Sequence, residues 1–278
     1  MIFQKKIEFY TLLLLMALLT SFTPGNKKST AAHQIKSIRK KIYSFPKGEK
    51  NFNNSYLIFD ELLKFKKDNI INQSFLYKSD TIFSYTDFYY DTANLLTESR
   101  EFNADNTIYL TIKFTHDKKG FTIRADYLRT NQKLYDSRRN PVEVEFEAYY
   151  KKLFTYVIYV NDFMGNVIEA KYFTADHTLL FKYTYQYDYK YHKTEIKYYN
   201  SKGSVSWRKK IKYNKRGLPS EYKLFMSNRP AMSAKITYTL NSYNDWTQRK
   251  ETRKLYGNFF ACDISDNTLI TTRDIEYY

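Results

Sequence analysis

The stretch EIKYYNSKG, residues 195–203, decides how this chain folds. Its first five residues have two further counterparts, EAKYF at 169–173 and EYKLF at 221–225, so the three copies begin 26 residues apart. Self-similarity at a fixed period of this size is the signature of a repeat architecture, in which one unit cannot bury its apolar face alone. The sequence therefore predicts a chain built from copies of one small unit.

The unit itself is predicted to be a β-hairpin. The turn-like segments YNSKG and YNKRG begin at Tyr199 and Tyr213, 14 residues apart, which leaves 12 residues to the next copy. Two strands of about eight or nine residues and two short turns fill such a period. The residues expected to hold the repeat are Glu169, Glu195, Glu221, Tyr199, Tyr213, Phe173 and Phe225.

The alternation of apolar and polar residues extends the same pattern to most of the chain. Clusters rich in Asn, Asp and Gly separate the alternating segments at 91–94, 103–106, 116–120, 161–166, 200–203 and 214–217. Such residues form turns, and connections this short force antiparallel pairing of consecutive strands. We therefore predict an all-β fold, an extended and curved antiparallel β-meander of hairpins.

Two segments depart from the repeat. The 26-residue count fails over residues 121–158, where we expect an irregular insert, either a hairpin or a longer loop. Residues 55–67 (SYLIFDELLKFKK) have spacing that a short helix could also satisfy. Because both neighbours are predicted strands, we favour strand–turn–strand about Asp60–Leu63.

The first residues resemble a targeting segment. Lys5 and Lys6 precede an apolar run at 11–19, and polar residues follow, which is typical of a secretory signal peptide over residues 1–23. The run is shorter than the about 20 residues that span a bilayer, although an uncleaved anchor is the alternative. A flexible leader at 24–34 and one repeat domain at 35–278 would follow.

These features predict an exported protein that is periplasmic, on the cell surface or secreted. No transmembrane span is expected after signal cleavage. No cysteine follows the apolar run directly, so we do not expect a lipoprotein. The single cysteine, Cys262, allows no internal disulfide and is expected to be a small packed residue.

The composition is aromatic and basic. Tyr, Phe and Trp make up 19% of the 278 residues, as suits half-buried pleated surfaces, and the formal net charge is +16. An excess of this sign attracts anionic partners such as phosphate-rich glycans. The alternative is that the basic residues merely form the solvated face of a sheet.

Several units together resemble the YD-repeat (RHS-like) proteins, in particular small exported bacterial members of uncharacterised function. The resemblance rests on YVNDFMGNVIEAKYF (159–173), YQYDYKYHKTEIKYY (185–199), YNKRGLPSEYKLF (213–225), SYNDWTQRKE (242–251) and ITTRDIEYY (270–278). Many Tyr-Asp pairs are replaced, and the turn glycine is missing at Asn94 and Tyr189. The resemblance implies an extended curved sheet of hairpins, which in large relatives spirals into a toxin-enclosing shell.

The glutamate row could in principle be catalytic. Strands one hairpin apart lie about 9.5 Å apart, and an inverting glycosidase needs two carboxyl groups about 6.5–9.5 Å apart. A repeat creates such rows automatically, however, and Lys171, Lys197 and Lys223 follow each glutamate by two residues on the same strand face. We favour cross-strand ion pairs that hold the strand register.

Other chemistry lacks a motif. The four histidines have no metal-ligand spacing, and no phosphate loop or nucleophile elbow is present. We therefore expect no enzyme activity, no catalytic or metal-binding residue and no cofactor.

The aromatic rows are the remaining candidates. Tyrosines at 183, 185, 187, 189 and 191 alternate with polar residues, so they would share one side of a strand. They form either the core of the sheet or a platform for a partner, as do Trp207 and Trp246. The possible ligand or partner surface is Tyr183, Tyr185, Tyr187, Lys197, Lys209 and Lys223.

The function predicted from the sequence is an exported, non-enzymatic binding or scaffolding module of the cell envelope or exterior. The expected partner is an anionic glycan or another envelope or secreted protein, and export disfavours nucleic acid. One alternative is a carbohydrate-active hydrolase that uses the glutamate row. Another is a carrier or immunity partner of a secreted protein, docked through an exposed edge strand.

Overall fold

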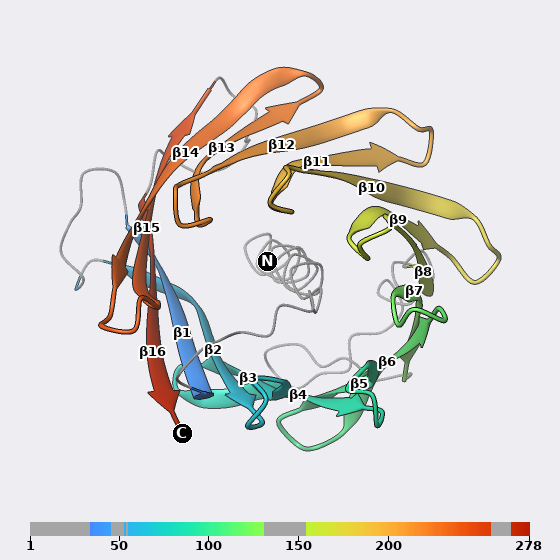
Figure 1. Cartoon of the computed structure of the whole chain (residues 1–278), viewed down its shortest axis with the longest axis horizontal. Coiled ribbons are helices and arrows are strands. Elements are labelled where there is room, and N and C mark those ends of the chain that lie inside the picture. The colour runs from blue at the N-terminus through green and yellow to red at the C-terminus, as the bar shows by residue number, and fades with distance from the viewer. Residues whose placement is uncertain (1–33, 46–52, 54, 131–153, 257–267) are drawn as a thin grey trace, which may run out of the picture.

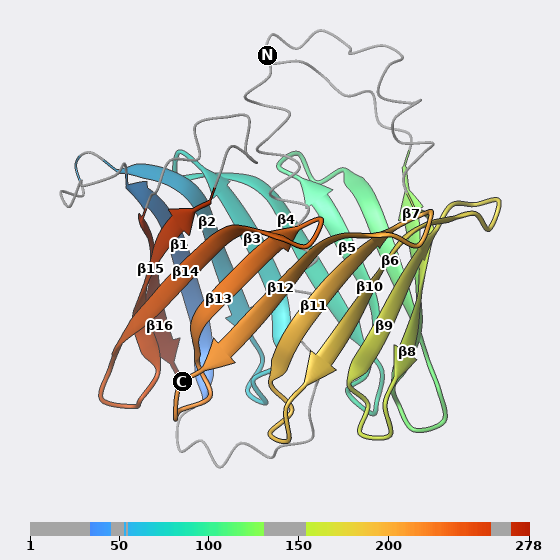
Figure 2. The same cartoon turned by 90° about the horizontal axis from the view of Figure 1, so that it is seen from above.

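The computed structural model describes residues 34–45, 53, 55–130, 154–256 and 268–278. Sixteen antiparallel strands form a closed barrel, seen down its axis in Figure 1 and from the side in Figure 2. Figure 2 also shows that the strands run obliquely around the wall, as barrel closure requires. In the described part of the chain, no helix is long and apolar enough to cross a membrane.

The strands are short and evenly spaced along the chain. They are β1 (Ile35–Phe45), β2 (Tyr56–Phe65), β3 (Ile71–Lys78), β4 (Thr81–Tyr90), β5 (Leu96–Asn103), β6 (Ile108–His116), β7 (Thr122–Arg129), β8 (Tyr156–Asn161), β9 (Val167–Phe173), β10 (Leu179–Tyr187), β11 (Lys193–Asn200), β12 (Val205–Tyr213), β13 (Pro219–Met226), β14 (Arg229–Leu240), β15 (Trp246–Leu255) and β16 (Thr268–Tyr277).

The predicted antiparallel β-meander is confirmed, since each strand pairs with the next one in sequence. The expectation of an extended sheet is wrong, because β1 also pairs with β16, with Ile42 opposite Thr271. Closure pairs the backbone groups that two free edges would expose. It leaves no free edge among the described strands.

Several turns of the barrel share one design. In the 214–218 turn, the Asn214 side chain accepts backbone hydrogen bonds from Arg216 (3.0 Å) and Leu218 (3.1 Å). Gly217 has φ +76°, a conformation in which a glycine carries no side-chain penalty. In the preceding repeat the equivalent position is Tyr191 at φ 62°, so the missing turn glycine lies there and not at Tyr189. The six predicted turn clusters all connect strands.

The prediction of a turn about Asp60–Leu63 is wrong, because β2 runs unbroken through these residues. Consecutive residues of a strand point to opposite faces, so Asp60 and Glu61 face different sides of the wall. Asp60 lies 2.9 Å from Arg39, and Glu61 lies 2.6 Å from Lys40. Both carboxylates are thus neutralised by β1, and the strand can continue.

The segment predicted to be irregular, 121–158, contains β7 and the start of β8, and these two strands pair with each other. Residues 131–153 between them lie outside the described residues. The predicted signal peptide, all of the leader except Gln34, and Cys262 also lie outside the described residues.

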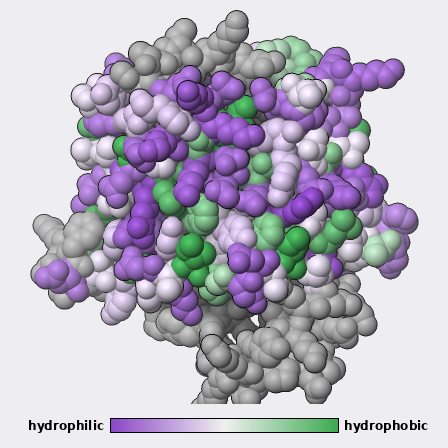
Figure 3. Space-filling model, turned by 90° about the horizontal axis from the view of Figure 1, so that it is seen from below, coloured by the Kyte–Doolittle hydropathy of each residue, from purple (hydrophilic) through white to green (hydrophobic). Residues whose placement is uncertain are grey.

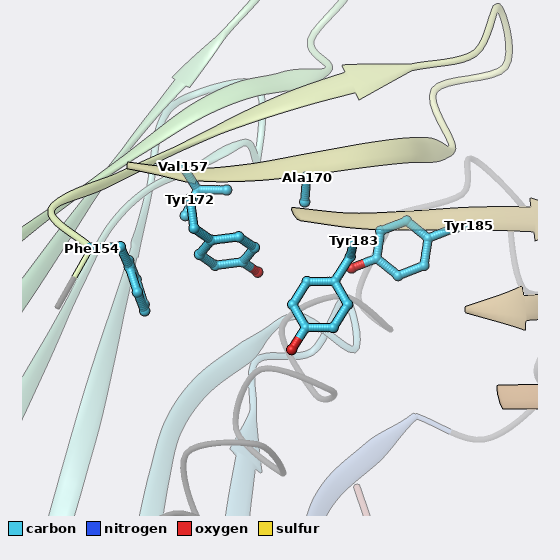
Figure 4. Packing of buried hydrophobic residues seen from close by; sticks show 6 residues of the cluster. All are labelled: Phe154, Val157, Ala170, Tyr172, Tyr183 and Tyr185. Atoms are coloured by element: carbon cyan, nitrogen blue, oxygen red, sulfur yellow. The ribbon is translucent and has the colours of Figure 1, made fainter. Parts of the chain in front are cut away.

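The wall has an inner and an outer face of different character. Figure 4 shows Phe154, Tyr172, Tyr183 and Tyr185 projecting from the wall into the barrel, where they form the aromatic cluster together with Val157 and Ala170. The alternating register carries this inner face around the barrel. The outer face is mostly hydrophilic, with scattered apolar residues, on the side shown in Figure 3.

Candidate functional site

The six residues of the predicted ligand surface lie on two opposite faces of the wall. Tyr183 and Tyr185 point inward, and the register places Lys209 with them, since Tyr185 is opposite Ile196 and Ile196 is opposite Lys209. Lys197 directly follows the inward Ile196, and Lys223 directly precedes the inward Leu224, so both lysines point to the outer face. No single surface can therefore use all six.

The inward tyrosines are packed core. Tyr183 and Tyr185 are only 8% and 6% exposed, and Tyr183 packs edge-on against Trp207 at 5.8 Å between ring centres. The Tyr187 hydroxyl donates a hydrogen bond of 2.8 Å to the Val167 carbonyl. Burial raises the pKa of all three phenols. These three tyrosines stabilise the wall and do not present an open platform for a ligand. Tyr189 does not belong to this row, since it lies beyond the end of β10.

The glutamate row forms ion pairs on the outer face, called here the outer ladder. Glu169 lies 2.7 Å from Lys171 and 2.8 Å from Lys182. Burial alone would raise the pKa of Glu169, but the two ammonium groups more than offset it and lower the pKa. A general acid needs a raised pKa, so this carboxylate is not prepared for acid catalysis.

The other repeats continue the outer ladder. Glu195 lies 2.9 Å from Lys197, and Glu221 lies 3.4 Å from Lys212 on the neighbouring strand. Such pairs contribute about 0.2–1 kcal/mol each, and the cross-strand ones, Glu169–Lys182, Glu195–Lys210 and Glu221–Lys212, oppose register slippage.

The aromatic repeat positions take part in the packing of the wall. Phe173 stacks on Tyr156 with ring centres 5.0 Å apart, and Phe225 lies 4.4 Å below the Arg208 guanidinium. Lys182 lies over the ring of Tyr199 at 5.1 Å. The Tyr213 hydroxyl donates to the Lys193 carbonyl at 2.8 Å. These four positions serve the structure of the wall.

Among the described residues, the inner face carries three buried carboxylates, at Glu61, Glu101 and Glu251. Glu61 pairs with Lys40 and accepts a hydrogen bond of 3.0 Å from Ser74. Glu101 accepts a hydrogen bond of 2.6 Å from the Tyr109 hydroxyl. Burial raises the pKa of Glu101, and that hydrogen bond together with the Arg129 guanidinium offsets the effect only in part. Among the described residues, neither of these two carboxylates has a surplus of cations around it.

The third carboxylate is the centre of what we call the Glu251 cluster: Lys209, Tyr222, Arg249, Glu251 and Arg253. Both arginines form ion pairs with Glu251, the Arg253 contact being 2.6 Å, and the Tyr222 hydroxyl donates to it. The Lys209 ammonium lies 3.9 Å from the centre of the Tyr222 ring. Three cations thus surround one carboxylate on the inner face of β12, β13 and β15.

The electrostatics of the Glu251 cluster follow from this imbalance. Burial would raise the pKa of Glu251, but Arg253 and Arg249 outweigh it and lower the pKa to about 2. Burial lowers the pKa of Lys209 to about 8; the Glu251 carboxylate opposes this shift, and the two arginines add to it. Among the described residues, no carboxylate pairs with Lys209. At neutral pH the cluster carries an excess positive charge that an anion would neutralise.

Sequence reasoning overlooked Arg249, Glu251 and Arg253. The signal was present in WTQRKETRKL (246–255), where charged residues occupy both parities of the strand. One face of a barrel strand points inward, so charges on both parities put some of them inside the barrel.

Two other candidates are weaker. A surface depression near the start of β3 and the end of β4 is lined by Lys66, Asn72, Gln73, Asp87, Phe88, Tyr89 and Tyr90. Its lining holds one lysine, Lys66, and one carboxylate, Asp87, so these charges balance and no surplus charge remains there. Within the described ranges, no three His, Cys, Asp or Glu side chains gather to hold a metal ion.

Comparison with known proteins informs the fold. The sequence matches no protein-family model, and no curated protein matches it. The structure is similar to a porin-like protein from Bacteroides uniformis, with a TM-score of 0.53 at 8% identity, over 87% of this chain and 98% of that one. At this identity the similarity supports a shared barrel fold alone.

Two further solved structures are more distant. A porin-like protein from Bacteroides vulgatus has a TM-score of 0.34 at 13% identity, over 86% of this chain and 97% of that one. A Tc holotoxin pore structure from Photorhabdus luminescens has a TM-score of 0.31 at 10% identity, over 72% of this chain but 13% of that one.

Proposed function

We propose that this chain is an exported, non-enzymatic binding protein of the cell envelope or exterior, and that it binds an anionic ligand at the Glu251 cluster on the inner face of its barrel. The observation that carries the proposal is the surplus of cations around one buried carboxylate. The proposal also includes the signal peptide and the relation to small YD-repeat proteins. The relation is supported by the 26-residue repeat, whose glutamates fall on the alternate strands β9, β11 and β13.

The outer face supports contact with water rather than with lipid. A transmembrane barrel presents an apolar band about 25 Å tall, and a Lys or Arg at its middle costs about 2–4 kcal/mol. Here the outer face carries Lys171, Lys197 and Lys210 within strands, paired with the glutamates of the outer ladder. A row of such groups is compatible with an aqueous compartment of the envelope.

The inner face supports a ligand that is an anion. A barrel of about eight strands is just filled by its own inward side chains, whereas 16-stranded barrels enclose more space. Two inward arginines share Glu251, and the nearby Lys209 ammonium faces an aromatic ring in place of a carboxylate. Phosphate or carboxylate groups are the natural partners of such donors.

The test is calorimetric titration with inorganic phosphate of the wild type and two neighbouring lysine variants. Lys209→Gln removes the inward charge, whereas Lys210→Gln removes an outward charge one residue away. We expect Lys209→Gln to weaken phosphate binding at least about tenfold and Lys210→Gln to change it less than about twofold. Equal effects, or a wild type that binds no phosphate, would overturn the proposal.

A second candidate is recognition of an anionic polysaccharide by the outer face. Lys210 and Lys212 are the observation in its favour, since their side chains are 56% and 70% exposed. Retention on a heparin-type resin tests it, because charge reversal at Lys197, Lys210 and Lys223 should lower the eluting salt concentration. Retention that depends instead on Lys209 alone would exclude this candidate.

A further inference from the structure

The surroundings of Lys209 point to a more specific ligand than a bare anion. On the two neighbouring strands, the residues directly opposite Lys209 are Ile196 on β11 and Leu224 on β13. Along its own strand, the adjacent inward positions are Trp207 and Ile211, since residues two apart share a face. Lys209 therefore leaves the wall at the centre of four apolar positions, and its ammonium lies over the Tyr222 ring.

These apolar side chains are only partly buried. Ile196 and Trp207 pack against the rim of the aromatic cluster, and Ile211 packs against the second core cluster, Tyr222, Ala234 and Ile236. The Trp207 ring stacks on Tyr198 with 5.9 Å between ring centres. The inner face of β11 to β13 is thus a half-exposed apolar surface that leads to the Glu251 cluster.

The charge arrangement has a direction along this surface. The two arginines lie on β15 and pair with Glu251, on the far side of Tyr222 from the aromatic cluster. Lys209 lies between them and Trp207, against the face of the Tyr222 ring. A ligand that contacts Lys209 can therefore place an acidic group toward the arginines and an apolar group toward Trp207.

We infer that the ligand is an anionic amphiphile, whose phosphate or carboxylate binds Lys209 and Arg253 and whose aliphatic or aromatic part lies along Ile196, Trp207 and Leu224. This inference rests on the proposed function and adds the ligand class. An inorganic anion would leave the apolar surface uncovered. A neutral lipid would leave the surplus charge of the Glu251 cluster unbalanced.

The experiment compares inorganic phosphate, octyl phosphate and octanol as monomers in solution, by calorimetry and by tryptophan fluorescence. Each methylene group that leaves water strengthens binding about three- to fourfold. We expect octyl phosphate to bind at least about 100-fold more tightly than phosphate, and octanol to bind far more weakly than octyl phosphate. A fluorescence change abolished in Trp207→Phe would place the alkyl chain beside Trp207 and not beside Trp246.

The variants separate charge from fold. Lys209→Met keeps the apolar stem and removes only the ammonium, so it should fold and should lose the preference for octyl phosphate over octanol. Lys210→Gln is the matched outer-face control and should retain that preference.

The outcomes distinguish this inference from the proposed function. If phosphate binds through Lys209 but octyl phosphate binds no more tightly, the ligand is not an amphiphile, and the proposed anion site is retained. If neither binds, both fail. If octanol binds as tightly as octyl phosphate, the phosphate head group contributes nothing to affinity, and the inference is overturned. Binding to phosphatidylglycerol vesicles that Lys209→Met leaves unchanged, without binding of monomeric octyl phosphate, would assign the ligand to the outer face and overturn the inference.

Discussion

Replacing Glu251 by Gln tests whether the Glu251 cluster is held together by charge. The carboxylate is 3% exposed, and its pKa falls from 4.5 to about 2 in the fold. At 1.36 kcal/mol per unit, this shift corresponds to about 3 kcal/mol of stability at neutral pH. Removing the charge also leaves Arg249 and Arg253 together without their counter-ion, and breaking a buried pair typically costs about 3–5 kcal/mol.

The direction of this pKa shift fixes how the stability contributed by Glu251 changes with pH. Because the folded-state pKa lies below the unfolded value, the stabilisation is complete above about pH 4.5 and is lost as the pH falls toward 2. The free energy of unfolding of Glu251→Gln should therefore be about 3 kcal/mol below that of the wild type at pH 7. The two proteins should converge between pH 4.5 and pH 2.

Urea unfolding followed by circular dichroism, repeated across this pH range, measures both quantities. Glu221→Gln is the matched control, since it removes a carboxylate of the outer ladder that pairs with a largely exposed lysine. It should cost less than about 1 kcal/mol. A loss below about 1 kcal/mol for Glu251→Gln, or a difference that does not change with pH, would refute the reasoning.

Three further predictions follow from other parts of the wall. Glu101→Gln should raise the free energy of unfolding at pH 7. Burial raises the folded-state pKa of Glu101, so its charge destabilises the fold at neutral pH. A lower free energy of unfolding of this variant in urea would contradict the prediction. Gly165→Ala should lower the free energy of unfolding by about 1–3 kcal/mol more than Gly203→Ala. Both glycines have positive φ, but of these two only a Cβ at Gly165 would clash, since it would lie 2.4 Å from the Phe121 ring. Equal decreases in Tm for the two variants would argue against that clash. Phosphate binding should be tighter at pH 6.5 than at pH 9.5, because the pKa of Lys209 is about 8 and the ammonium loses its proton above that pH. Calorimetry of Lys209→Gln should show a smaller change of phosphate affinity with pH.

The strands and turns could be predicted because their determinants are local. Period-two alternation marks the strands, and an Asn or Asp that begins a turn accepts hydrogen bonds from backbone two and four residues ahead, as Asp91 does from Ala93 and Leu95. The 26-residue period follows from repetition of this unit. Neither feature depends on residues far away in the chain.

Closure was not predictable from the same signals. It depends on the curvature that accumulates over all strands and on the pairing of β1 with β16, which joins the two ends of the chain. Each hairpin looks alike whether the sheet is open or closed. The same limit explains β2, where Asp60 and Glu61 resemble a turn until β1 supplies their cations.

The candidate site could have been recognised in part from strand parity. In VSWRKKIKY (205–213), Arg208, Lys210 and Lys212 share one face, whereas Lys209 shares the other with Trp207 and Ile211. A lone cation in an apolar row is a stronger signal than membership of a basic cluster. Grouping Lys209 with Lys197 and Lys223 by charge alone concealed this difference.

The most direct test of the account is a cross-link between the first and last strands, because an inner face exists only if the barrel closes. Ile42 and Thr271 are directly opposite on the inner face, and residues opposite each other in antiparallel strands lie about 4.5–5.5 Å apart, within disulfide range. With Cys262 replaced by Ser, Ile42→Cys combined with Thr271→Cys should form an intramolecular disulfide in the folded monomer. Ile42→Cys with Ile270→Cys, whose side chains point to opposite faces, should not. Absence of the first cross-link under oxidising conditions, or equal yields for the two pairs, would contradict the closed barrel and the site inside it.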